Sequence, residues 1–177
     1  MKVGVISDTH LSGRGFSFKK IANKLITRSQ EGPEGLLTLI EKHFNGVNRI
    51  LHAGDLIDLE ILNLIEGFAP VDAVQGNMDI SPVKNHLPIK KVLTIEGKKI
   101  GLIHGWGAPT GIVERIRPEF DNVDAIIFGH THTPMNEVIE GVLFFNPGSP
   151  TDQRFAPFNS MGILEIGSEI KGTIIKL

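Results

Sequence analysis

The sequence contains no cysteine, so neither disulfides nor thiolate metal sites can form, and any bound metal must be held by nitrogen and oxygen. It also lacks a run approaching the roughly 18 to 20 consecutive apolar residues that a membrane-spanning helix requires. The first residues enter a predicted strand at once, which leaves no room for a signal peptide. We therefore expect a cytoplasmic protein without a membrane segment.

The balance of residue types is that of a globular chain. Apolar residues make up 41% and charged residues 21% of the 177 residues, which excludes a disordered chain. A chain of this length buries one core without splitting, so we expect a single domain over residues 1–177. The net charge of −2 argues against a general nucleic-acid binder, although a nucleotide-type substrate stays open.

The first half of the chain alternates between apolar runs and helical patterns. Runs at 3–6, 50–52 and 71–74 are separated by amphipathic patterns at 33–44 and 57–68. A strand that is buried on both faces reads as a continuous run of Val, Ile and Leu. The alternation therefore predicts parallel strands joined by right-handed helical crossovers.

The second half predicts paired strands instead. Turns at 96–99 and 140–141 each separate two short apolar runs, as in a β-hairpin, and one short helix is expected over 110–117. The expected strands of this half are 92–95, 100–103, 125–128, 138–139, 142–145, 161–166 and 173–175. Together the two halves predict an α/β fold of two packed sheets with flanking helices, an α/β sandwich.

Five of the apolar runs end in Asp, His or Asn. In open α/β sheets the functional groups gather beyond the carboxyl ends of the strands, so we expect these side chains to meet. The seven candidates are Asp8, His10, Asp55, Asn77, His104, His130 and His132. Each has a structural alternative on its own: Asp8 as a cap, Asn77 as a turn residue and His104 as a core histidine.

The joint pattern points to a specific chemistry. A single structural zinc needs four ligands, whereas seven nitrogen and oxygen groups suit two hard or borderline divalent ions. Two such ions, about 3.5 to 4 Å apart, make a bound water acidic near neutral pH and hold the attacking and leaving oxygens of a phosphoryl centre. The sequence therefore favours two-metal hydrolysis through a metal-bound hydroxide.

This ordered set resembles the motifs of the calcineurin-like metallophosphoesterase superfamily. The motifs are Asp-x-His at 8–10, Gly-Asp at 54–55, Gly-Asn at 76–77, His104 and Gly-His-x-His at 129–132. The chain length resembles that of the small bacterial and archaeal phosphodiesterases, whose eukaryotic relative is the retromer scaffold subunit. Asn-Pro-Gly-Ser at 146–149 followed by Arg154 also resembles this subgroup.

The resemblance implies a ligand set and a reaction. One ion would be bound by Asp8, His10, Asp55 and His132. The other would be bound by Asp55, Asn77, His104 and His130, so that Asp55 bridges the two ions. Mn²⁺ is the first choice, with Fe, Ni, Zn and Mg open. The implied activity is hydrolysis of a small phosphate diester. The alternatives are a phosphomonoesterase and a catalytically weak or silent interaction scaffold of the same fold, and a homo-oligomer stays open.

The sequence departs from the family pattern at residue 78. Many members read Gly-Asn-His-Asp/Glu, in which the His is thought to assist the leaving group, but this chain reads Gly76-Asn77-Met78-Asp79. Met has no proton to donate. Asn77 and Asp79 remain the catalytic candidates, and Asp79 is either a partner that supports the ligands or a loop carboxylate.

Three further features have open interpretations. The segment 11–30 carries five basic residues and no acidic one, and we expect a helix over 18–28 within it. Its basic surface fits a solvated helix face, a lip over an anion-binding site or a subunit contact. Trp106 is expected in the core, with a pocket wall as the alternative. His52 is expected to be partly buried in a strand, or to support the ligands.

Overall fold

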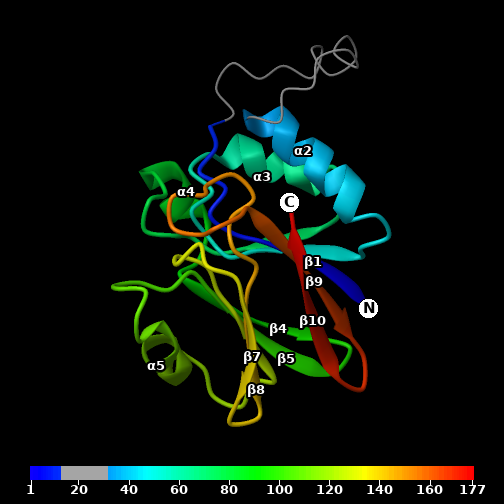
Figure 1. The fold of residues 1–177 in the computed structure, drawn as a ribbon, viewed down its shortest axis with the longest axis vertical. Helices are drawn as coiled ribbons and strands as arrows, with labels where there is room; N and C mark the ends of the chain where they lie inside the picture. The colour runs from blue at the N-terminus through cyan, green and yellow to red at the C-terminus, as the bar shows by residue number, and fades with distance from the viewer. Residues whose placement is uncertain (13–31) are drawn as a thin grey trace.

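The computed structural model describes residues 1–12 and 32–177 (Figure 1). One sheet has the strand order β10-β9-β1-β2-β3, formed by β1 (Lys2–Ile6), β2 (Arg49–His52), β3 (Val71–Ala73), β9 (Ser160–Ile166) and β10 (Ile170–Lys176). The second has the order β4-β5-β6-β8-β7, formed by β4 (Lys90–Ile95), β5 (Lys98–Ile103), β6 (Ala125–Ile127), β7 (Met135–Ile139) and β8 (Val142–Asn146). The predicted sandwich of two sheets with flanking helices is confirmed.

Three apolar clusters divide the fold into layers. Helices α2 (Gly32–His43) and α3 (Leu59–Glu66) lie side by side in Figure 1 and pack on the outer face of the first sheet. A second cluster fills the space between the sheets. The third packs α5 (Ile112–Ile116) against the outer face of the second sheet. The central strands, among them β1, β2, β6 and β8, are therefore buried on both faces, which explains their continuous apolar runs.

Strand β1 shows how the two faces are used. Val3 and Val5 belong to the cluster between the sheets, and Ile6 belongs to the cluster under α2 and α3. All three side chains are fully buried. Because successive strand residues point to opposite faces, a single apolar run contributes side chains to two apolar clusters.

Parallel pairing aligns the carboxyl ends of the central strands. In the first sheet β1 pairs with β2 and β2 with β3, which places Ile6 beside His52 and His52 beside Ala73. In the second sheet β5 pairs with β6, which places Leu102 beside Ile127. The loops after these five strands carry the seven candidate side chains.

Both predicted hairpins are present, as β4 with β5 and β7 with β8. Each turn has a Glu followed by a Gly, and all four residues have positive φ, between 49° and 79°. Two consecutive left-handed residues give the turn that matches the twist of the flanking strands. The sequence prediction missed the short helix α4 (Ser81–His86), which has Pro82 in its first turn and only Val83 buried.

The predicted basic helix over 18–28 lies outside the described residues. Of the segment 11–30, the structure describes Leu11 and Ser12, and Leu11 forms a parallel β-bridge with Ile57. In the described part of the chain, no helix is both long and apolar enough to cross a bilayer.

Candidate functional site

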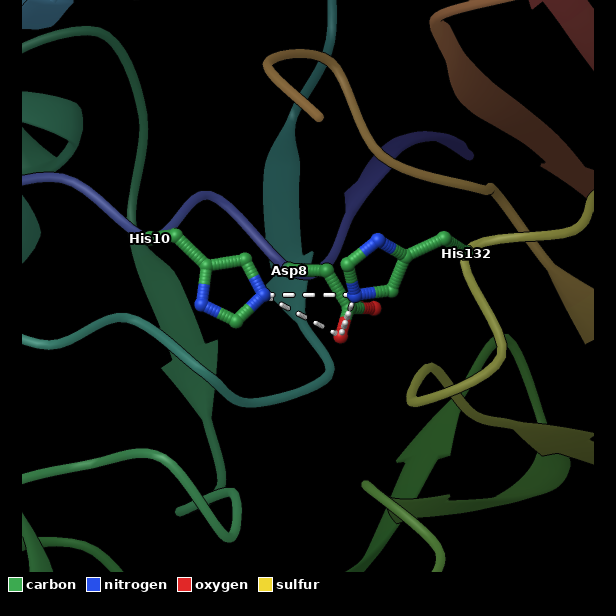
Figure 2. Close-up of side chains that lie close together, drawn as sticks. All are labelled: Asp8, His10 and His132. Atoms are coloured by element: carbon green, nitrogen blue, oxygen red, sulfur yellow. Dashed lines mark hydrogen bonds and ion pairs between the residues drawn. The ribbon is translucent and has the colours of Figure 1, made fainter. Parts of the chain in front are cut away.

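The structure brings all seven candidate side chains into one cluster. Three of them converge in Figure 2: Asp8 and His10 from the loop after β1, and His132 from the loop after β6. His132 Nε2 lies 3.2 Å from Asp8 Oδ1 and 3.2 Å from His10 Nε2. Their ligand-type atoms are close enough together to hold one metal ion.

The remaining four side chains adjoin this group. His104 Nε2 lies 3.3 Å from Asp55 Oδ2 and 3.1 Å from Asn77 Oδ1. His130 Nδ1 lies 2.9 Å from the same amide oxygen. Asp8, Asp55 and His104 form a second set of ligand-type atoms within reach of one ion.

Both carboxylates lie between the two groups. Asp8 Oδ1 is 3.9 Å from His10 Nε2 and 3.9 Å from His104 Nε2. Asp55 Oδ2 is 3.8 Å from His10 Nε2 and 3.3 Å from His104 Nε2. The family resemblance gives the bridging role to Asp55, and the structure places Asp8 in a comparable position.

The donor set fits a divalent cation. Asp8 and Asp55 are 0% and 2% exposed, and within the described residues their ion pairs are all to histidines. Burying a carboxylate is costly unless a charge partner compensates it. Imidazole and carboxylate groups without a fixed Lys or Arg partner form a site that a hard or borderline metal ion can neutralise.

Backbone carbonyls orient two of the histidine rings. His104 Nδ1 lies 2.7 Å from the oxygen of Ala53, and His130 Nε2 lies 2.7 Å from the oxygen of Gly107. A carbonyl can only accept, so each of these nitrogens carries the proton. The other nitrogen of each ring then points into the cluster, which is the arrangement that metal-binding histidines use.

Electrostatics inside the cluster favour positive charge. Burial acts to lower the pKa of His104, but its hydrogen bond to Asp55 and the charges of Asp8 and Asp55 outweigh burial and raise that pKa. Burial acts to raise the pKa of Asp55, but the hydrogen bond and charge of His104 lower it. The field that draws a proton to His104 also attracts a metal cation.

The backbone around the site adopts a rare conformation. Five of the seven candidates have positive φ: Asp8 (54°), His10 (47°), Asp55 (55°), His130 (69°) and His132 (56°). Such left-handed geometry is uncommon outside glycine, although Asp and His tolerate it better than most residues. It turns the chain sharply after β1, β2 and β6, and strain of this kind clusters at functional sites.

Asp79 ties the loop that carries Asp55 to the loop that carries Asn77. Its carboxylate accepts hydrogen bonds from the N–H of Ile57 at 2.6 Å and of Gly76 at 2.7 Å. The N–H of Met78 donates to Asp55 Oδ1 at 2.7 Å. Burial raises the pKa of Asp79. A Cβ at Gly76 would overlap the Asp55 carboxylate, so this close approach requires glycine.

Sequence reasoning missed Asp152. Its Oδ2 lies 3.5 Å from His132 Nδ1, a buried nitrogen with no hydrogen-bond partner among the described residues. Hydrogen bonds from Arg154 lower the pKa of Asp152 to about 2, so the carboxylate is charged at neutral pH. Asp152 does not directly follow the predicted strand 142–145, and the strand-end rule could not find it. The only signal was its place just before Arg154 and after the Asn-Pro-Gly-Ser motif.

Two sequence expectations are wrong in detail. Trp106 is 42% exposed and is not a core residue. His52 is fully buried rather than partly buried, and burial lowers its pKa to about 4. Its ring lies between Thr9 Oγ1, at 3.1 Å from Nε2, and the N–H of Gly54, at 3.2 Å from Nδ1. A neutral His52 therefore supports the loops that carry Asp8 and Asp55.

We predict that Asp152→Asn weakens metal binding about 10- to 100-fold, because carboxylates that orient a metal-binding histidine typically contribute that much to affinity. Asn keeps the size of the side chain but removes the charge beside His132 Nδ1. Calorimetric titration with Mn²⁺ and the ring-nitrogen NMR shifts of His132 measure the effect. The control is Asp121→Asn at an exposed position. Equal Mn²⁺ affinities in the two variants would show that Asp152 does not orient His132.

Comparison with known proteins gives a consistent assignment. Residues 1–169 match the model of the calcineurin-like phosphoesterase superfamily domain. A probable metallophosphoesterase of Methanocaldococcus jannaschii is 36% identical over 180 residues, covering 100% of this chain and 82% of that protein. The phosphodiesterase YfcE of Escherichia coli is 27% identical over 141 residues, covering 68% of this chain and 74% of its own.

A solved structure shares the fold along the whole chain. Wild-type Vps29 of Entamoeba histolytica, complexed with Zn²⁺, matches with a TM-score of 0.64 and 25% sequence identity, covering 99% of each chain. The match of the family model includes every loop that carries a candidate ligand. On this evidence, the chain belongs to the calcineurin-like phosphoesterase superfamily.

Proposed function

We propose that this protein is a metal-dependent phosphodiesterase that binds two divalent ions. The observation that carries the proposal is the convergence of seven side chains with nitrogen or oxygen donors, two of which are buried carboxylates. The similarity to the phosphodiesterase YfcE supports a diester as the substrate. In the reaction, water is consumed, one P–O ester bond breaks, and the products are a phosphate monoester and an alcohol.

The ligand groups divide between the ions as the family pattern suggests. We assign Asp8, His10, Asp55 and His132 to one ion and Asp55, Asn77, His104 and His130 to the other. Mn²⁺ is our first choice among divalent ions that accept imidazole and carboxylate ligands, with Fe, Ni, Zn and Mg as alternatives. Ions held there would act as Lewis acids that polarise the phosphoryl oxygens and make water a better nucleophile near neutral pH.

Two backbone carbonyls and Asp79 position these ligand groups. The Ala53 and Gly107 carbonyls hold the rings of His104 and His130. Asp79 ties the loop that carries Asp55 to the loop that carries Asn77. Met78 has no proton to donate to a leaving group, so this position supplies no general acid. The side chains of this site therefore suit diesters whose leaving group departs as a stable anion.

Hydrolysis of bis(4-nitrophenyl) phosphate tests the proposal. Turnover should require added Mn²⁺, vanish with a chelator, and coincide with two bound ions per chain. 4-Nitrophenyl phosphate, assayed in parallel, tests the phosphomonoesterase alternative. Full activity after removal of metal would contradict the metal-dependent mechanism. Two bound ions without turnover of either ester would favour the interaction scaffold instead.

A further inference from the structure

Phe155 is an exposed aromatic residue beside the candidate metal centre. Its side chain is 65% exposed. Its ring makes a T-shaped contact with the His132 ring, with centroids 5.3 Å apart and planes at 81°. Because the ring planes are nearly perpendicular, the imidazole does not stack flat on the phenyl ring, and most of the Phe155 side chain stays open to solvent.

A closed set of contacts fixes this ring next to the site. Arg154 lies over the Phe155 ring, 5.6 Å from its centroid, and its Nη2 donates to Asp152 Oδ2 at 2.6 Å. Asp152 in turn lies 3.5 Å from His132 Nδ1, and His132 contacts Phe155. Thr133 Oγ1 also donates to the Phe155 carbonyl, at 3.4 Å. The aromatic surface is therefore placed relative to His132 in advance of any ligand, which lowers the entropy lost on binding.

The exposure of Phe155 is unusual for a phenylalanine in this fold. Five others are at most 4% exposed and fill the apolar clusters: Phe44, Phe120, Phe128, Phe144 and Phe145. Phe68, which is 44% exposed, lies two residues beyond the end of α3, where its N–H donates to the Ile65 carbonyl. Phe155 is thus an apolar group left open to solvent in contact with a candidate ligand.

We propose that Phe155 is a stacking surface for a flat group on the substrate, so that the enzyme prefers aryl or nucleoside phosphodiesters to small alkyl diesters. The proposal rests on the phosphodiesterase function proposed above. In a diester, two ester groups extend from the phosphorus atom, and one of them stays attached during hydrolysis. A phosphorus atom held by the cluster leaves that retained arm next to His132, where a nucleobase or aryl ring can stack on Phe155. Such stacking tolerates different bases, since every base has a π-face.

Two substrates with the same leaving group isolate this contact. Thymidine 5′-(4-nitrophenyl) phosphate and ethyl 4-nitrophenyl phosphate differ only in the retained arm. With Mn²⁺, wild type should prefer the thymidine diester by about 10-fold in kcat/KM, within the range of stacking contributions per base. Phe155→Ala should reduce this preference to near one, mainly by raising KM for the thymidine diester. Phe155→Leu, which keeps apolar volume without a π-face, should fall between the two.

Phe68→Ala is the matched control, and it should keep the wild-type preference. An unchanged preference in Phe155→Ala, or equal losses on both diesters, would overturn the stacking role, since a purely structural contact with His132 would impair both substrates alike. Binding of thymidine 5′-phosphate and ethyl phosphate to the Mn²⁺-loaded protein, measured by calorimetry, gives a second readout. If neither diester is hydrolysed, the phosphodiesterase function fails, and a tighter, Phe155-dependent binding of thymidine 5′-phosphate still decides the stacking proposal.

Discussion

Asp55→Ala is expected to lower kcat/KM for a diester by at least about 10³-fold and to leave fewer than two ions bound per chain. Asp55 Oδ2 approaches histidines of both groups, at 3.8 Å from His10 Nε2 and 3.3 Å from His104 Nε2. Its loss therefore affects both metal positions. Metal ions contribute several kcal/mol of transition-state stabilisation, and each 1.36 kcal/mol is a factor of about ten in rate.

Two further variants separate the two metal positions. His132→Ala should weaken the binding of mainly one ion, because His132 contacts Asp8 and His10 but belongs to only one of the two ligand sets. His86→Ala removes an exposed histidine at the end of α4 and should bind metal like wild type. Metal content by elemental analysis and turnover are measured on all three proteins. Two tightly bound ions in Asp55→Ala would exclude a bridging role for this carboxylate.

Met78→His is expected to raise turnover of alkyl phosphate esters about 10²-fold and to flatten the dependence of rate on the leaving group. General acid catalysis typically contributes about 10²- to 10⁴-fold, and departure of a basic alkoxide needs a proton. Met78 is 58% exposed, and its N–H bonds Asp55 Oδ1 at 2.7 Å, so a side chain at this position starts next to the cluster.

The gain should fall at the lower end of that range. Both oxygens of Asp79 already accept backbone N–H groups, so this carboxylate is held in place and cannot turn toward a new imidazole. The measurement is a plot of log kcat against leaving-group pKa at equal metal loading. Met78→Leu is the control and should reproduce the steep wild-type plot. A flat plot for wild type would mean that another group protonates the leaving oxygen.

Most of the fold follows from local sequence patterns. Buried strands such as β1 read as unbroken apolar runs, and the Glu-Gly turns mark both hairpins. The strand-end rule then found the seven side chains of the cluster because parallel pairing aligns the ends of the strands. These features depend on near neighbours in the chain or on the period of a strand, which the sequence records directly.

Other features depend on contacts between distant segments. Asp152 reaches His132 only because the loop after β8 folds over the loop after β1, where Ser149 Oγ donates to the Asp8 carbonyl at 2.8 Å. Trp106 was expected inside because large aromatic side chains usually are, but its place in the loop after β5 leaves it at the surface. Neither the partner of His132 nor the exposure of Trp106 has a local periodic signal.

The left-handed backbone at the candidate ligands has a consequence for the evolution and engineering of this chain. Non-glycine residues in that conformation cost of order 1 to 3 kcal/mol each, and five of them occur in the cluster. Glycine would relieve the strain at any of these positions. The residue types that could bind a metal there are therefore not the ones that would make the fold most stable. Selection for thermal stability alone would therefore drive the cluster toward glycine and erase it, while selection for turnover must retain a less stable protein.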